Sequence, residues 1–179
     1  MQSIQTVSEN TIYVGASDRR LAKFENLFPI PRGVSYNAYV ILDEKTALLD
    51  TADASVGAQF LENVAAALDG RKLDYLIVDH MEPDHAAMIE AVLVRWPDLR
   101  LVVNAKTLPM LKMYFPTDSA AIDDALVVKE GDTLDLGKHK LTFVMAPMVH
   151  WPEVMMTFDT TTGTLFSADA FGTFGALEG

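Results

Sequence analysis

The sequence predicts an α/β fold of the mixed, α+β kind, in which helices cover a mixed β-sheet on at least one face. In the first two thirds of the chain, short apolar runs alternate with segments of helical spacing, a pattern typical of βαβ units. Later apolar runs are separated by short glycine-containing turns, a pattern typical of β-hairpins. With 179 residues, of which 50% are hydrophobic, the chain is expected to form one globular domain over residues 1–179.

Each predicted strand rests on a short apolar run bounded by turn residues. Residues 11–14 form the first, and residues 34–42 and 46–49 are expected to pair as a hairpin around the turn at 43–45. The other predicted strands cover residues 76–78, 99–103, 125–128, 133–136, 141–144, 154–158 and 164–166.

Three helices are predicted from apolar residues at helical spacing. The first covers residues 58–68, and Gly70 is placed to end it with a left-handed cap. The second follows His85 and stops near Trp96-Pro97, and the third covers residues 108–114.

Composition excludes several classes of partner and site. The net charge of −11 argues against nucleic acid as a partner, because a phosphate backbone needs a basic footprint. The chain has no cysteine, so any metal ligands must be imidazole or carboxylate. No signal peptide and no apolar run of membrane-spanning length is visible, so we expect a cytoplasmic protein without membrane contact.

Four side chains of metal-ligand type lie within six residues, His80-Met81-Glu82-Pro83-Asp84-His85. They follow the apolar run at 76–78 and precede a helical pattern, so the cluster is expected on a strand-to-helix loop. Open α/β sheets bind their ligands at the carboxyl ends of strands. Pro83 stiffens this loop because its ring fixes φ.

Two later residues have a similar position. His150 comes shortly after the strand at 141–144, and Asp169 follows the strand at 164–166. If these strands are neighbours, their ends meet at one edge of the sheet. The residues that could then surround two metal ions are His80, Glu82, Asp84, His85, His150 and Asp169.

This pattern resembles the flavodiiron proteins, a branch of the metallo-β-lactamase superfamily. The matching residues are His80-x-Glu82-x-Asp84-His85, then His150 and Asp169. The stretches at 33–39, 48–51, 150–152 and 166–172 also look like that family. The resemblance implies a metallo-β-lactamase-like αββα sandwich with a mixed sheet.

The resemblance also implies a ligand set for two iron ions. One iron would take His80, Glu82 and His150, the other would take Asp84, and Asp169 would bridge them. His85 is a further ligand candidate. The resemblance assigns it to neither iron, because this position need not bind metal throughout the family. The hydrolytic branch typically has histidine where this chain has Glu82, and the added carboxylate favours iron over zinc.

The chain departs from the family pattern in one respect. The family's domain continues and supplies another histidine to the second iron, whereas this chain stops at Gly179. We therefore expect that the carboxyl-terminal part of the domain, and the flavodoxin-like domain that binds FMN, lie outside it. His139, in a predicted hairpin turn, is interpreted as a surface residue, and Asp18-Arg19-Arg20 as a solvated turn.

The resemblance implies an oxidoreductase that reduces dioxygen, nitric oxide or both. FMN on a partner domain, reduced by a rubredoxin-like donor, would supply electrons in a homodimer. No catalytic residues beyond the metal ligands and no flavin-binding residues are identified, so the chain alone is expected to be inactive. A diiron oxygen-binding sensor and a zinc-dependent hydrolase of the superfamily remain alternatives.

Overall fold

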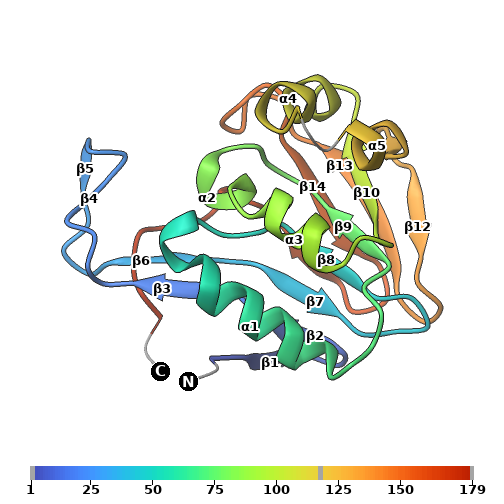
Figure 1. Ribbon diagram of the computed structural model, residues 1–179, viewed down its shortest axis with the longest axis horizontal. Coiled ribbons are helices and arrows are strands. Elements are labelled where there is room, and N and C mark those ends of the chain that lie inside the picture. Colours follow the sequence, from blue (N-terminus) through green and yellow to red (C-terminus); the bar gives the residue numbers. More distant parts are fainter. Residues whose placement is uncertain (1–2, 117–118, 178–179) are drawn as a thin grey trace.

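Two β-sheets pack face to face, with helices on the outer face of the larger sheet (Figure 1). The computed structural model describes residues 3–116 and 119–177. The mixed α/β class is confirmed, and the strands form two principal sheets, as the αββα sandwich implied by the family resemblance requires. Apolar patterning shows that a strand has a buried face but does not show which sheet it joins.

The larger sheet has seven strands and is mixed. Its first four strands pair antiparallel and its last four pair parallel, so the β8 strand has one neighbour of each kind. In spatial order the strands are β1 (Gln5–Ser8), β2 (Thr11–Tyr13), β7 (Tyr39–Ile41), β8 (Ala47–Leu49), β9 (Tyr75–Ile77), β10 (Arg100–Asn104) and β11 (Leu126–Val128).

The second principal sheet is antiparallel and contains the hairpins predicted near the end of the chain. Its strands are β12 (Thr133–Asp135), β13 (Lys140–Met145), β14 (Met155–Asp159) and β15 (Thr164–Phe166). The chain passes from one sheet to the other between Val128 and Thr133. A buried cluster that includes Leu49, Ile77 and Phe143 joins the two sheets.

Residues 34–42, predicted as one strand, divide into two. β6 (Val34–Tyr36) pairs with β3 (Ala16–Asp18), whereas β7 pairs within the larger sheet. The chain therefore changes sheets at residues 37–38, while the predicted hairpin between β7 and β8 is confirmed. A further hairpin, β4 (Lys23–Phe24) with β5 (Phe28–Pro29), projects from the body of the molecule (Figure 1).

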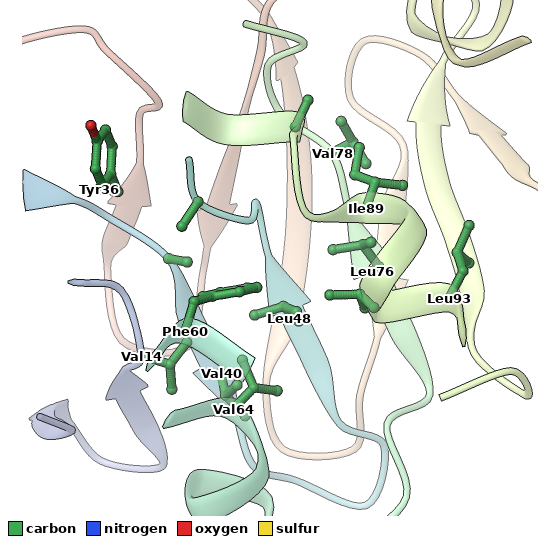
Figure 2. Close-up of a cluster of buried hydrophobic side chains, with 14 of the residues drawn as sticks. Val14, Tyr36, Val40, Leu48, Phe60, Val64, Leu76, Val78, Ile89 and Leu93 are labelled. Atoms are coloured by element: carbon green, nitrogen blue, oxygen red, sulfur yellow. The ribbon is translucent and has the colours of Figure 1, made fainter. Parts of the chain in front are cut away.

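Helices cover the larger sheet because apolar residues recur along one side of each helix. Phe60 and Val64 of α1 (Gly57–Leu68) and Ile89 of α3 (Ile89–Arg95) are fully buried against Val40, Leu48 and Leu76 (Figure 2). Burial of a side chain such as Phe60 stabilises the fold by roughly 2–3 kcal/mol. The other helices are the 3-10 turn Ala54–Val56, α2 (Pro83–Ala86), α4 (Thr107–Tyr114) and α5 (Ser119–Asp123).

The end of α1 differs in detail from the prediction. Asp69, not Gly70, is the C-cap residue, with a left-handed φ of 46° and an N–H that donates to the Ala65 carbonyl. Gly70 follows with a φ of 80°. Aspartate is among the few residues that tolerate this conformation. α1 has 12 residues, and none of the described helices has the length and apolar character that crossing a membrane requires.

The prediction of a surface position is wrong for His139 and for Asp18, whereas Arg19 and Arg20, predicted in the same solvated turn as Asp18, are exposed. His139 is fully buried, and its Nδ1–H donates to Asp159 Oδ2 at 2.8 Å. Asp18 is 4% exposed, lies on β3, and accepts hydrogen bonds from the Arg20 backbone and guanidinium. In both cases a partner from the surrounding structure satisfies the polar group, and residue type alone does not show such a partner.

The buried contact between His139 and Asp159 should make stability depend on pH. Burial tends to raise the pKa of Asp159, but hydrogen bonds from Thr162 and His139 outweigh it and lower the pKa. A lowered carboxyl pKa adds stability above the unfolded value of about 3.9, and this stability disappears as pH falls through the folded pKa. Asp159→Asn should therefore lower the free energy of unfolding by about 1–3 kcal/mol at pH 7.

This difference between the parent and Asp159→Asn should shrink as the pH drops below about 4. Urea unfolding at several pH values would measure it. A difference that stays constant down to pH 3 would show that the carboxylate charge is irrelevant.

Candidate metal centre

Strand ends from both sheets place the candidate side chains at one edge of the molecule. His80 follows β9, His150 lies in the loop between β13 and β14, and Asp169 follows β15. Glu82 is the extended residue before α2, and Pro83 occupies the first turn of that helix. Asp84 and His85 therefore lie on α2 and not on a loop, because proline is well suited to begin a helix.

One group of side chains comprises His80, Glu82, His150 and Asp169, whose ligand atoms all lie within 4.8 Å of one another. Glu82 Oε2 lies 2.8 Å from His150 Nε2 and 3.2 Å from His80 Nε2. Asp169 Oδ2 lies 3.1 Å from His150 Nε2. Two imidazole nitrogens and two carboxylates thus face a common point.

A second group comprises Asp84, His85 and Asp169, with ligand atoms again within 4.8 Å of one another. Asp169 Oδ1 lies 2.9 Å from His85 Nε2, and Asp84 Oδ2 lies 3.7 Å from the same nitrogen. Asp169 thus belongs to both groups and presents a different oxygen to each. The six side chains converge as expected, and Asp84 lies in the second group. Their role as metal ligands stays a prediction.

Burial and mutual contacts shift the ionisation of these groups. Burial tends to raise the pKa of Asp169, yet hydrogen bonds from His80 and His85 hold it far below its usual value. Burial would lower the pKa of His80, but hydrogen bonds to Asp169 and Glu82 raise it to about 10. Burial raises the pKa of Asp84 to about 6. A cation that binds here must therefore displace protons from the imidazoles.

The donor set fits a pair of divalent or trivalent cations. Three imidazoles and three carboxylates point inward, and Asp84 Oδ1 is buried without a hydrogen-bond partner. A buried carboxylate oxygen without a partner is costly unless a proton, water or cation satisfies it. Oxygen-rich ligand sets suit hard cations, whereas structural zinc sites are usually built from sulfur and nitrogen.

Two carboxylates behind the histidines were not singled out by the sequence analysis. Asp50 Oδ2 lies 3.0 Å from His85 Nδ1, and Glu153 Oε1 lies 2.8 Å from His80 Nδ1. Each carboxylate contacts the ring nitrogen that faces away from the ligand group. Asp50 lies in a stretch noted for its family resemblance, directly after a strand, and Glu153 directly follows His150-Trp151-Pro152. These positions are the features of the sequence that point to Asp50 and Glu153 as neighbours of the site.

A cavity of about 450 Å³ opens onto five of the six side chains, all except His80. Its outer wall is formed by the β4–β5 hairpin, through Phe24 and Phe28, and by Phe174 near the end of the chain. The Phe24 and Phe174 rings are 5.1 Å apart and join these two segments. The mouth of the cavity is thus lined by three aromatic rings and by one charged side chain, Glu25 of the hairpin, while its floor carries the ligand-type side chains. Such a mouth suits a small molecule.

The two packed sheets, with histidine and carboxylate side chains gathered at one edge, define a metallo-β-lactamase-like domain with two neighbouring groups of ligand-type residues. Residues 34–178 match the family model described as ODP family beta lactamase. The chain belongs to this family, and its resemblance to flavodiiron proteins is confirmed by the relatives it matches.

One curated relative is the anaerobic nitric oxide reductase flavorubredoxin of Klebsiella pneumoniae, which is 37% identical over 168 residues. The match covers 93% of this chain and 34% of that protein. The chain thus spans about a third of the length of this relative.

Solved structures of flavodiiron proteins share the fold. The flavodiiron protein of Giardia intestinalis superposes with a TM-score of 0.91 at 28% identity, over 99% of this chain and 42% of that chain. Rubredoxin oxygen:oxidoreductase of Desulfovibrio gigas superposes with a TM-score of 0.91 at 31% identity. That match covers 98% of this chain and 43% of the other. The expected metallo-β-lactamase-like fold is therefore confirmed.

Proposed function

We propose that this chain is the metal-binding part of a flavodiiron-type oxidoreductase that reduces dioxygen, nitric oxide or both. The observation that carries the proposal is Asp169, whose two oxygens face two separate groups of ligand-type side chains. A carboxylate in this position could be shared by two cations, one on each side. The names of the relatives, a nitric oxide reductase and a rubredoxin oxygen:oxidoreductase, support the reaction class.

The six side chains divide between two ions in this proposal. His80, Glu82 and His150 would hold the first, Asp84 and His85 would hold the second, and Asp169 would contribute an oxygen to each. The contact between His85 and Asp50 supports His85 as a ligand, because metal-binding histidines usually donate their other N–H to a carboxylate or carbonyl. Iron bound here would supply the electron-transfer chemistry that zinc lacks.

The chain's own residues position the ions and control access to them. The Trp151 ring packs edge-on against His80, with centroids 5.4 Å apart, and limits the entry of water on that side. The mouth lined in part by Phe24, Phe28 and Phe174 admits a small substrate. The three carboxylates, with Glu82 at a position where hydrolases typically carry histidine, favour iron over zinc.

Electrons are proposed to come from FMN on a flavodoxin-like domain, itself reduced by a rubredoxin-like donor, in a cytoplasmic homodimer. The words flavorubredoxin and rubredoxin in the names of the relatives support this scheme. The sensor and zinc-hydrolase alternatives are not favoured, since relatives that match this chain include two named as nitric oxide reductases and one named as a rubredoxin oxygen:oxidoreductase.

Anaerobic reconstitution with Fe²⁺ tests the proposal. We expect up to two iron ions per chain by elemental analysis, with the second bound more weakly because its group has three ligand residues against four in the first. A chain with both ions bound should give a Mössbauer spectrum typical of a coupled diiron centre. Oxygen or nitric oxide consumption should require an added, reduced FMN-bearing flavodoxin-like domain, because a cofactor must carry the electrons to the irons. Stoichiometric zinc together with hydrolysis of thioesters or lactams would contradict the proposal.

A further inference from the structure

Glu153 is a buried carboxylate next to the metal centre that does not point into it. Its side chain is fully buried, as is that of His80. Glu153 Oε1 accepts two hydrogen bonds, from His80 Nδ1–H at 2.8 Å and from the Met81 backbone N–H at 3.0 Å. The second oxygen, Oε2, has no hydrogen-bond partner. Burying a carboxylate with one oxygen unsatisfied is costly, so its contact with His80 needs an explanation.

The backbone around Glu153 is fixed by contacts to neighbouring strands. The Asn104 amide, at the end of β10, donates to the Glu153 carbonyl, and Lys106 Nζ donates to the Pro152 carbonyl at 3.0 Å. Met155, two residues after Glu153, donates its N–H to the Asp79 carbonyl at 3.0 Å, and Asp79 directly precedes His80. These bonds hold Glu153 and His80 in a constant relative position.

The contact determines which ring nitrogen of His80 is available to a metal. An ionised carboxylate only accepts hydrogen bonds, so Nδ1 must carry a proton when it faces Glu153. The nitrogen left to bind a cation is then Nε2, which lies 3.2 Å from Glu82 Oε2 and 3.5 Å from Asp169 Oδ2. Carboxylate contacts of this kind orient a ligand imidazole and raise its basicity.

We propose that Glu153 is a positioning residue that fixes the ring and tautomer of His80 and strengthens metal binding at the first of the two ion sites. This inference rests on the proposed function, because it assumes that His80 is a ligand. Asp50 makes the corresponding contact to His85, so each of these two imidazoles is supported by its own buried carboxylate.

Two substitutions separate the charge of Glu153 from its hydrogen bonds. Glu153→Gln keeps the shape and one accepting oxygen, whereas Glu153→Met keeps the approximate length and removes every acceptor. The probe is Fe²⁺ alone, and its dissociation constant from the 179-residue chain is measured anaerobically by competition with a chelator. We expect binding to weaken about 10-fold in Glu153→Gln and about 100-fold in Glu153→Met.

Asp159→Asn is the matched control. Asp159 makes an equivalent 2.8 Å contact to a buried histidine, His139, but lies at the far end of β14 from Glu153. This variant should lose stability and leave Fe²⁺ affinity unchanged. A loss of affinity in the control that equals the loss in Glu153→Gln would overturn the inference, because it would show a general structural effect.

A second measurement needs no metal. In the metal-free chain, the His80 Nδ1–H proton should give a strongly downfield, slowly exchanging NMR signal because it is buried against Glu153. The signal should move upfield in Glu153→Gln and disappear in Glu153→Met. Unchanged signals and unchanged Fe²⁺ affinity in both variants would overturn the inference and leave the proposed function intact. A parent chain that binds no iron would instead refute the proposed function, and the NMR signal would still decide whether Glu153 fixes the His80 ring.

Discussion

Asp169→Asn should reduce metal content from two ions per chain to one or fewer, with a loss of affinity of at least about 100-fold at the weakened site. Asp169 Oδ1 faces His85, and Oδ2 faces His150 and His80. An asparagine offers one oxygen and an amide nitrogen that is a poor ligand. One of the two groups therefore loses the carboxylate oxygen that Asp169 presents to it, and the remaining group keeps only an uncharged amide oxygen.

Elemental analysis after anaerobic reconstitution with Fe²⁺ would measure this loss. Asp135→Asn is the control, because it makes the same chemical change at an exposed ion pair with Lys140 on the second sheet. Two iron ions bound with parental affinity in Asp169→Asn would show that this residue does not bridge the two groups.

Glu82→His should shift the metal preference from iron toward zinc by about tenfold or more in relative affinity. Glu82 Oε2 contacts both His80 and His150, and the hydrogen bond from His80 makes the largest contribution to lowering the pKa of Glu82. The glutamate is therefore an anion at neutral pH. Exchanging it for a neutral imidazole removes one negative charge and one hard oxygen ligand, which weakens the preference for iron.

Competition between Fe²⁺ and Zn²⁺ under anaerobic conditions, followed by elemental analysis, would measure this preference. Glu62→His, at an exposed position in the middle of α1 and outside the candidate centre, is a suitable control. An iron-to-zinc ratio that is the same in the parent and in Glu82→His would show that Glu82 does not determine the choice of metal.

The short-range features of this protein were predictable from its sequence. The hairpins of the second sheet and the helices with regular apolar spacing lie close to where the patterns placed them, because the periodicity of a segment depends only on neighbouring residues. The convergence of His80, His150 and Asp169 was also predictable. Each residue comes shortly after a strand, and neighbouring strand ends meet at one edge.

Only the tertiary structure decided how the strands divide between two sheets and which polar residues are buried. Residues 34–42 were predicted as one strand, yet the chain changes sheets within them, because strand partners come from distant parts of the sequence. His139 was interpreted as a surface residue, but Asp159 from a neighbouring strand makes its burial possible.

The same distinction applies to the candidate metal centre. The sequence by itself singled out the six side chains that the structure brings together in two groups, since their residue types and spacing carry the signal. The structure alone showed that Asp50 and Glu153 support two of the histidines and that the β4–β5 hairpin forms the mouth of the cavity. Those contacts join residues at least 35 positions apart, and no local pattern encodes a contact over that separation.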